Sequence, residues 1–479
     1  MNLFVILVIV SINFADNHYT KCGFINELNH PSSTRSRPEN DTYASSPNNL
    51  FHIHYDLSGG DAPSQNDTNS NGIPDYIDEV GIAAEYSLDI ITNQLGFEPF
   101  PPDDDGIYDI YVDDRAPGNY GVNYIDIDSN GNNLGGSSYI KIDNAFEQGE
   151  FFTTGLSAMR VTVAHELFHA VQRSYQIYPS PSSLFLYEMT STWIEDIVYP
   201  DVNDYIYWTD TFFDDPEQVI SDTDGYSIAF YGHYLTSVVN SNTIKQVWEK
   251  FSDVNNAIYS LDFVLNQNYN SSFIDSWIDF CSRNIFNGQY TDMANDFYYY
   301  IDQIYADPLT FDNIEPLIEN TSMDNLVLHD DQLTIKLFEP NSNFIIDDII
   351  STSPYVVGNL VLSSNILDNQ NIIDIDTSQG ECVPVNQIYM LLGSSQNSVI
   401  TDIDLTFSVN TQNGNGDINY DCETNVLDII ILVDIILGNY NDGQTPSNDV
   451  LIDSDINEDN NINVVDIVAL VNEILDILW

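Results

Sequence analysis

Residues 161–172, VTVAHELFHAVQ, constrain the chain most, because they combine an apolar helical pattern with the motif His-Glu-x-x-His. Residues four apart share one face of a helix, so His165 and His169 can offer two imidazole nitrogens to one metal ion, with Glu166 beside them. The apolar residues around the motif indicate a buried helix. We therefore expect a metal-bearing helix that lines a cleft.

This motif is typical of zinc-dependent hydrolysis. A zinc ion on the two histidines would lower the pKa of a bound water to about 7, and Glu166 would take the proton as that water attacks a carbonyl group. The expected reaction is hydrolysis of a peptide bond. The alternative is a core helix with two hydrogen-bonded histidines.

A catalytic zinc ion needs a third protein ligand and an open fourth position. The metzincin extension of the motif is excluded, because Gln172 and Tyr175 stand where that pattern has glycine and histidine. A second helix is expected over residues 184–198. It carries Glu188, which follows the second histidine after eighteen residues, and Glu195, two turns further along on much the same face. Glu195 is either a partner behind a ligand or the ligand itself.

The spacing to Glu188 resembles that of the gluzincins, the thermolysin-like and aminopeptidase-like zinc proteases, whose third ligand is a helix glutamate about twenty residues after the second histidine. The resemblance implies Glu188 as the third ligand. The pieces FHIHY, NGIPDY, YDIYV and AHELFHAVQ together resemble a bacterial family of secreted metalloproteases, over roughly residues 50 to 305. That likeness implies no defined substrate.

The order of the expected elements, strands and then helices, is that of an α+β zincin-like domain. Strands are expected over 50–55, 107–112 and 138–142, a helix over 77–95 ended by Gly96, and further helices to about Tyr305. His52 and His54 share a strand face, and we expect a half-buried strand there rather than a metal site.

Zincins of this kind also carry a tyrosine or histidine that donates a hydrogen bond to the oxyanion of the reaction. Residues 224–235 are typical of a loop that enters a third helix, and they offer Tyr226, Tyr231 and His233. The sequence does not choose among the three. Ordinary packed aromatic side chains are the alternative for each.

Residues 67–78 fit a calcium-binding loop of the EF-hand type, with oxygen side chains at positions 1, 3, 5, 9 and 12 and glycine at position 6. Position 12 is aspartate rather than glutamate, which is expected to lower the calcium affinity or to recruit Glu79. The alternative is a turn rich in Asn and Asp that binds no ion. The expected ligands are Asp67, Asn69, Asn71, Ile73 through its carbonyl, Asp75 and Asp78.

The C-terminal region contains an internal repeat, in which a calcium-loop pattern precedes an apolar helix twice. The pair resembles a type I dockerin, which implies binding to a cohesin on a scaffold or cell surface. Cys422 and Asn460 replace the glycine of the two loops, and the alternative is a calcium-stabilised cap without a partner. The expected calcium ligands are Asp417, Asn419, Asp421, Asn425 and Asp428, and then Asp455, Asn457, Asp459, Asn463 and Asp466.

The N-terminal residues 3–10 are wholly apolar and too few to span a bilayer, so we expect an atypical signal peptide and a protein that is secreted or associated with the cell surface. No later stretch is expected to be a transmembrane anchor. Lys plus Arg number 11 against 74 Asp plus Glu, a net charge of −63 that excludes nucleic acid and anionic membranes as partners and indicates saline surroundings. Four cysteines without CxxC spacing argue against a cysteine zinc site.

The expected organisation is a signal peptide (1–15), a leader, linker or propeptide (16–49), a zincin-like metallopeptidase domain (50–305), a small β-sandwich (308–410) and a dockerin-like domain (411–479). Zn²⁺ and Ca²⁺ are the expected cofactors, and a protein or peptide is the expected substrate. The main alternative is a non-enzymatic adhesin or scaffold-associated protein whose zinc site is structural or inactive. A carbohydrate-active enzyme, suggested only by the dockerin-like tail, is a third possibility.

Overall fold

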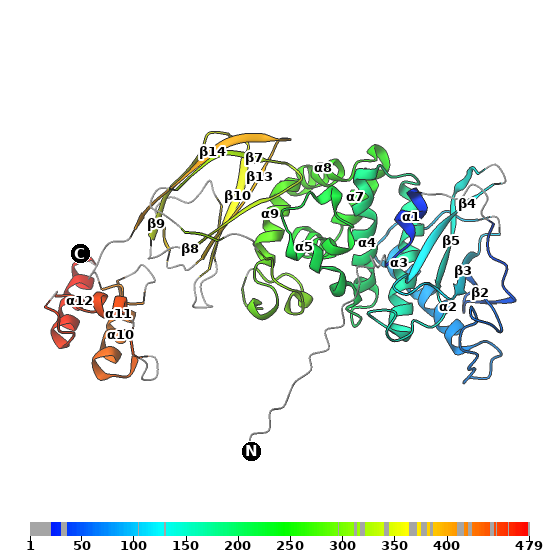
Figure 1. Ribbon diagram of the computed structural model, residues 1–479, viewed down its shortest axis with the longest axis horizontal. Helices are drawn as coiled ribbons and strands as arrows, with labels where there is room; N and C mark the ends of the chain where they lie inside the picture. Colours follow the sequence, from blue (N-terminus) through cyan, green and yellow to red (C-terminus); the bar gives the residue numbers. More distant parts are fainter. Residues whose placement is uncertain are drawn as a thin grey trace, which may run out of the picture. The chain divides into compact units, whose positions relative to one another are not determined.

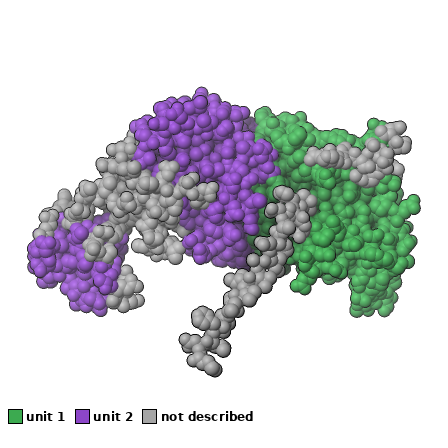
Figure 2. All heavy atoms as spheres, in the orientation of Figure 1, with its two compact units in different colours: residues 1–209, 224–236, 240–260 green, residues 210–223, 237–239, 261–479 purple. Residues whose placement is uncertain are grey.

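The structure is a computed structural model. The residues that it describes form two compact units (Figure 2). One comprises the described residues within 1–209, 224–236 and 240–260, and the other those within 210–223, 237–239 and 261–479. The expected signal peptide lies outside the described residues. These are 21–29, 36–103, 105–128, 131–295, 297–310, 314–316, 321–339, 344–363, 371–374, 381–383, 387–409, 416–419, 424–440, 445–446, 448–457 and 459–477.

A five-stranded mixed sheet organises the first unit, in the order β1-β2-β3-β5-β4 (Figure 1). The strands β2, β3 and β5 are parallel, while β1 and β4 pair antiparallel at the two edges. Because β1 precedes residue 50 and pairs with β2, the expectation that the folded domain begins at residue 50 is wrong. The strands are β1 (Thr42–Ser45), β2 (Phe51–Tyr55), β3 (Tyr108–Asp113), β4 (Gly121–Ile127) and β5 (Asn133–Asp143).

Two long helices cover this sheet. The first, α2 (Asp75–Leu88), continues as a π-helical segment to Gln94 and stops before Gly96, whose φ of 75° suits glycine, as the sequence predicts. The second, α3 (Gly155–Tyr175), carries the HELFH motif and packs against α2, β4 and β5. Helix α3 is buried on all its faces over most of its length, from Ala158 to Arg173.

The remaining helices of the first unit pack around α3, around α4 or on the sheet. Residues 184–198 form α4 (Leu184–Val198), with the bounds that the sequence predicts, and α4 packs against α3 and α6. The short helix α1 lies against β4. The bounds are α1 (Phe24–Asn29), α6 (Ala229–Tyr234) and α7 (Thr243–Val254), with 3-10 turns at Pro181–Ser183, Asp204–Trp208 and Tyr226–Ile228.

The second unit contains two sheets, β11-β10-β13-β8-β6 and β12-β9-β14-β7, which share one hydrophobic core as in a β-sandwich. Helix α9 (Phe273–Asn284) packs against β10 and β13, so the helical region expected to end the catalytic domain near residue 305 belongs in part to this unit. Helices α5 (Asp210–Asp214) and α8 (Ala257–Tyr269) precede α9. The strands are β6 (Ile314–Pro316), β7 (Thr321–Leu328), β8 (Thr334–Glu339), β9 (Phe344–Ser351), β10 (Val356–Ser363), β11 (Asn371–Asp374), β12 (Glu381–Val383), β13 (Gln387–Ser394) and β14 (Val399–Val409).

The C-terminal repeat forms the helices α10 (Val426–Leu437), α11 (Asn448–Asp453) and α12 (Val464–Ile477). Helices α10 and α12 pack on each other around Leu432 and Leu470. The two halves of the repeat therefore bury a common small core. In the described part of the chain, every helix is too short or too polar to cross a membrane.

Candidate metal centre

Three buried side chains from two helices converge at the centre of the first unit. His165 and His169 come from consecutive turns of α3, and Glu188 comes from the first turns of α4. The His165 Nε2 atom lies 3.1 Å from His169 Nε2 and 3.1 Å from Glu188 Oε2, while His169 Nε2 lies 3.3 Å from the same oxygen. The three atoms thus form a nearly equilateral triangle.

This triangle has the dimensions of a metal site. A tetrahedral ion with bonds of about 2.0–2.1 Å has neighbouring ligand atoms about 3.3 Å apart. The Glu188 Oε1 atom is buried and has no hydrogen-bond partner among the described residues. Two imidazole nitrogens 3.1 Å apart, with a carboxylate oxygen about equally far from both, can all be satisfied by one shared cation. These residues can therefore hold a metal ion.

The Nδ1 atom of each imidazole, which points away from the triangle, has a hydrogen-bond partner of its own. The His165 Nδ1 atom lies 2.7 Å from Glu195 Oε1, and His169 Nδ1 lies 2.7 Å from Gln172 Oε1. A proton on each Nδ1 leaves each Nε2 lone pair free for a metal. Glu195 thus orients His165 from outside the triangle, while Glu188 supplies an oxygen to it.

The ionisation of the site follows from burial and from its close charges. Burial alone would lower the pKa of His165, but its hydrogen bonds to Glu188 and Glu195 outweigh burial and raise this pKa to about 9. Burial would raise the pKa of Glu188, but the charge of His169 and the hydrogen bond to His165 lower it to about 2. Glu188 is therefore a carboxylate, which is the form that binds a cation.

Glu166 lies beside the triangle and differs from Glu188. Burial raises the pKa of Glu166, although both histidines oppose this, and its Oε2 atom has no hydrogen-bond partner among the described residues. Gly121 makes room for it, because a Cβ atom there would lie 2.9 Å from the Glu166 Cγ atom. A carboxyl group with a raised pKa and an unpartnered oxygen can exchange a proton with a nearby water.

Cys22 is a member of the centre that the sequence did not predict. Cys22, His165, His169 and Glu188 each offer a ligand atom, and these four atoms all lie within 4.8 Å of one another. Burial, followed by the charges of Glu166 and Glu188, raises the pKa of the Cys22 thiol well above its usual value. The missing CxxC spacing argues against a cysteine zinc site in the sequence, but the structure places Cys22 among these possible ligands.

The three candidate oxyanion donors lie in different surroundings. Tyr226 is beside the centre, since its hydroxyl accepts a hydrogen bond from the Cys22 amide at 3.3 Å and its ring lies 6.1 Å from that of His165. Tyr231 stacks on Tyr234 instead. His233 lies 3.5 Å from Asp196, and burial lowers its pKa to about 3. Tyr226 is thus the candidate that the structure brings to the metal-binding side chains.

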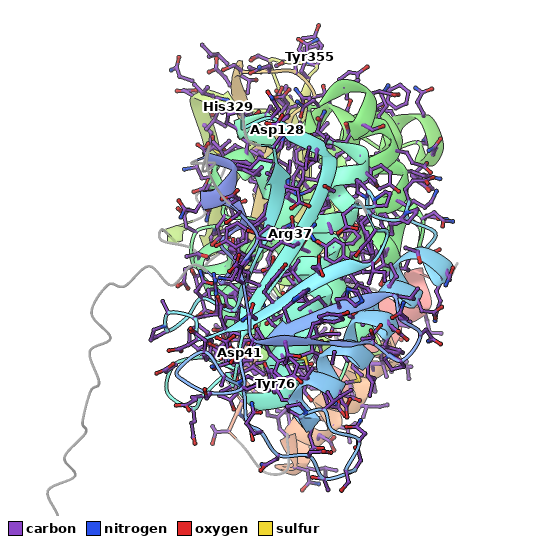
Figure 3. The ribbon with its side chains drawn as sticks, turned by 90° about the vertical axis from the view of Figure 1, so that its right-hand side faces the viewer. Arg37, Asp41, Tyr76, Asp128, His329 and Tyr355 are labelled. Atoms are coloured by element: carbon purple, nitrogen blue, oxygen red, sulfur yellow. The ribbon has the colours of Figure 1, made fainter. Side chains whose placement is uncertain are left out.

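A second group of possible ligands lies on the sheet. His52, His54 and Asp109 offer atoms within 4.8 Å of one another, and His54 Nε2 lies 2.6 Å from Asp109 Oδ1. Arg37, labelled in Figure 3, donates a hydrogen bond to the Asp109 carboxylate and two more to Asp126, at 2.9 and 2.6 Å. Because the guanidinium already neutralises Asp109, this group is less suited to a cation than the buried centre. Both histidines are half-buried, as the strand pattern predicts.

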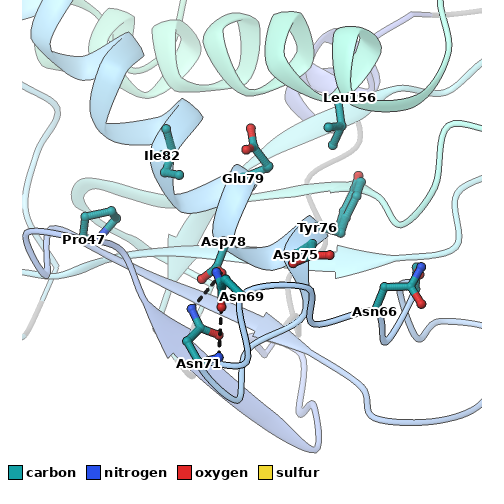
Figure 4. Close-up of a pocket in the computed structure, with 11 residues that line it drawn as sticks. Pro47, Asn66, Asn69, Asn71, Asp75, Tyr76, Asp78, Glu79, Ile82 and Leu156 are labelled. Atoms are coloured by element: carbon teal, nitrogen blue, oxygen red, sulfur yellow. Dashed lines mark hydrogen bonds between the residues drawn. The ribbon is translucent and has the colours of Figure 1, made fainter.

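The expected calcium loop 67–78 lies at the start of α2, beside a surface pocket of about 580 Å³ (Figure 4). Asp78 Oδ2 accepts hydrogen bonds from the side-chain amides of Asn69 and Asn71 at 3.0 and 2.8 Å, and Asp67 accepts from the backbone of Asn71 and Gly72. Asp75 instead binds Thr68. Four of the expected ligands, Asp67, Asn69, Asn71 and Asp78, are thus linked by hydrogen bonds within the loop, in which Gly72 has a φ of 88°.

The two C-terminal loops have related hydrogen bonds. Asp428 accepts from the amides of Ile418 and Asn425, and Asp466 accepts from those of Asn457 and Asn463, so the last acidic residue of each loop ties its two ends together. Asp455 accepts from Asp459 and Asn460. Residue Asp421 lies outside the described residues. Asp417, Asn419, Asn425 and Asp428 belong to the first loop, and all five expected ligands of the second are described.

The buried centre therefore combines two imidazoles, two carboxylates and a thiol, with a tyrosine hydroxyl at its edge. Such a set can bind a metal ion, move a proton and donate a hydrogen bond to an oxygen atom. Comparisons with protein-family models, with curated proteins and with solved structures found no match to this chain.

Proposed function

We propose that the chain is a zinc-dependent peptidase, in which His165, His169 and Glu188 hold the metal and Glu166 is the general base. The observation that carries the proposal is the triangle of ligand atoms 3.1, 3.1 and 3.3 Å apart, with the raised-pKa carboxyl of Glu166 beside it. Two nitrogens and one carboxylate oxygen are a ligand set typical of catalytic zinc. Bound zinc supplies a water of lowered pKa and polarises the substrate carbonyl.

The residues of the chain divide the remaining work. Glu166 takes the proton of the attacking water and can pass it to the leaving amine. Tyr226 can donate its hydroxyl proton to the oxyanion, since burial raises its pKa and keeps it protonated. Glu195 and Gln172 hold the two imidazoles in the orientation that leaves both Nε2 atoms toward the metal.

We further propose that the protein acts outside the cell, with calcium in the loop 67–78 and in the two C-terminal loops. The loop oxygens are gathered around short backbone turns, and a net charge of −63 is screened best where salt and divalent ions are abundant. A cohesin-type protein is the partner proposed for the C-terminal repeat.

The test measures metal content and hydrolysis of casein or mixed peptides by the wild type, Glu166→Ala and His169→Ala. We expect one zinc per chain in the wild type and in Glu166→Ala, little zinc in His169→Ala, and hydrolysis that depends on Glu166. A folded wild type that binds no zinc contradicts the proposal. Zinc without hydrolysis, also in the Cys22 variant described next, favours a non-enzymatic surface protein with a structural zinc ion.

A further inference from the structure

We propose that the thiolate of Cys22 is the fourth ligand of the zinc ion, so that residues 21–24 close the metal centre in a latent form of the enzyme. This inference rests on the proposed function, because it concerns the position that a catalytic zinc ion keeps open for water and substrate. The Cys22 sulfur lies within 4.8 Å of a ligand atom from His165, His169 and Glu188. It is a free thiol whose residue is 3% exposed.

The chemistry of a thiol suits this position. Zinc binds thiolates strongly, and four protein ligands are typical of zinc sites that have no catalytic water. The thiol must lose its proton when the zinc–sulfur bond forms. Glu166 lies beside the centre, and its buried Oε2 atom has no hydrogen-bond partner among the described residues, so it can accept that proton. A Glu166 engaged in this way, with sulfur in place of water, cannot act as the general base.

Contacts on both sides of Cys22 hold it in the centre. On one side, Lys21 Nζ lies 2.6 Å from Glu195 and 2.6 Å from Asp204, and all three side chains are buried. On the other side, the Phe24 ring stacks on the imidazole of His169 with centroids 3.9 Å apart and an interplanar angle of 4°. Phe24 therefore contacts one histidine of the centre directly, whereas Lys21 contacts Glu195, the hydrogen-bond partner of the other histidine.

The same segment occupies the outer edge of β4, where an extended peptide could otherwise add to the sheet. Strand β4 is the last strand of the sheet, and residues 21–23 bond to its outer side. The Tyr120 amide donates to the Lys21 carbonyl at 2.9 Å, and the Gly23 amide donates to the Gly121 carbonyl at 2.9 Å. An extended peptide that adds to a sheet edge uses these same backbone groups. The segment and a substrate strand thus exclude each other at this edge.

Burial of the whole centre agrees with a latent form. His165 and Glu166 are 1% exposed, and His169 and Glu188 are 0% exposed. A peptide cannot reach a metal held by side chains so completely covered, whereas catalytic zinc sites are open on one side. Departure of residues 21–24 from the centre would free the fourth position, the edge of β4 and the face of His169 together.

The experiment uses the full chain loaded with one equivalent of zinc, as wild type, Cys22→Ser and Cys281→Ser. X-ray absorption at the zinc edge should show a sulfur neighbour at about 2.3 Å in the wild type and in Cys281→Ser, and no sulfur in Cys22→Ser. Cys281 is the matched control, because it is also a buried free thiol but lies in α9 of the other unit. Peptide hydrolysis should rise at least tenfold in Cys22→Ser and disappear when Glu166→Ala is added.

The ligand assignment, the latency and the proposed function are each contradicted by a different result. A wild type that binds one zinc without a sulfur neighbour, or a sulfur neighbour that remains in Cys22→Ser, overturns the assignment of the ligand. Hydrolysis that does not rise in a folded, zinc-bound Cys22→Ser overturns the latency. A wild type that binds no zinc overturns the proposed function itself. Thermal unfolding verifies the fold of each variant, and Cys22→Ala serves if Cys22→Ser does not fold.

Discussion

Glu188 and Glu195 can be separated by the affinity for zinc that remains after each is changed to glutamine. Both are fully buried on α4, and both contact His165, at 3.1 Å from Nε2 for Glu188 and 2.7 Å from Nδ1 for Glu195. Only Glu188 also lies 3.3 Å from His169 Nε2. In the proposed site, Glu188 is therefore the metal ligand and Glu195 orients a histidine ligand.

The expected magnitudes differ accordingly. Loss of a carboxylate that orients a histidine ligand typically weakens metal affinity about 10- to 100-fold, which is about 1.4 to 2.8 kcal/mol. Glu195→Gln should fall in this range, because Lys21 keeps Asp204 as an ion-pair partner and no buried cation is left alone. Glu188→Gln removes a charged ligand and should weaken affinity by more than about 100-fold, the upper bound for an orienting group.

The assay is competition for zinc against a chromophoric chelator, in a Cys22→Ser background so that the thiol cannot replace the lost ligand. The exposed Glu147→Gln is the control for a lost negative charge, and its affinity should stay within twofold of the parent. Thermal unfolding checks that each variant is folded. If Glu195→Gln loses zinc and Glu188→Gln holds it within tenfold of the parent, the assignment is wrong and Glu195 is the ligand.

Gly225→Ala should lower the free energy of unfolding by about 1–3 kcal/mol more than Gly149→Ala in urea denaturation. Both glycines have positive φ, but a Cβ atom at Gly225 would lie 2.8 Å from Glu188 Cβ, whereas one at Gly149 would meet nothing within 4 Å. Equal losses would show that this close approach is not needed. Burial lowers the pKa of His233 from 6.5 to about 3, so as pH falls His233 becomes protonated in the unfolded chain before it does in the folded one. The stability that neutral, buried His233 contributes is therefore complete above pH 6.5 and is lost as pH falls toward 3. Wild type should therefore lose up to about 1.4 kcal/mol per pH unit more than His233→Gln in that window, and parallel curves would contradict this. EGTA should lower the melting temperature of the C-terminal helices before that of the first unit, and an unchanged melting profile would remove the calcium assignment.

The local sequence pattern is sufficient to predict the helices α3 and α4, which carry most of the candidate metal centre. The HELFH motif predicts two possible ligands on one helix face, and the apolar run over 184–198 predicts α4 with the bounds that the structure has. The helix over 77–95 was recognisable because its apolar period ends at Gly96. These features depend on neighbours within one or two turns, which a sequence displays directly.

Other features of the centre depend on contacts between distant residues. Glu188 and Glu195 share a helix face, and only the packing of α4 on α3 distinguishes their positions relative to His165. The sequence does not predict Cys22 at the centre, because a six-residue helix and a single bridge to Gly121 have no period to detect. The possible ligands around it, His165, His169 and Glu188, are more than one hundred residues away. A signal was available in Lys-Cys-Gly, since a lysine is uncommon in a chain with 11 basic residues.

The burial of Lys21 determines how the segment around Cys22 responds to ionic strength. Salt screens exposed charges over about 10 Å at 0.1 M, whereas a fully buried ion pair is shielded from that screening. The side chain of Lys21 is 1% exposed and its two carboxylate partners are 0% exposed. High salt, which relieves repulsion across the acidic surface, therefore leaves this anchor intact. A brine that favours the folded chain would also keep residues 21–24 over the proposed metal centre.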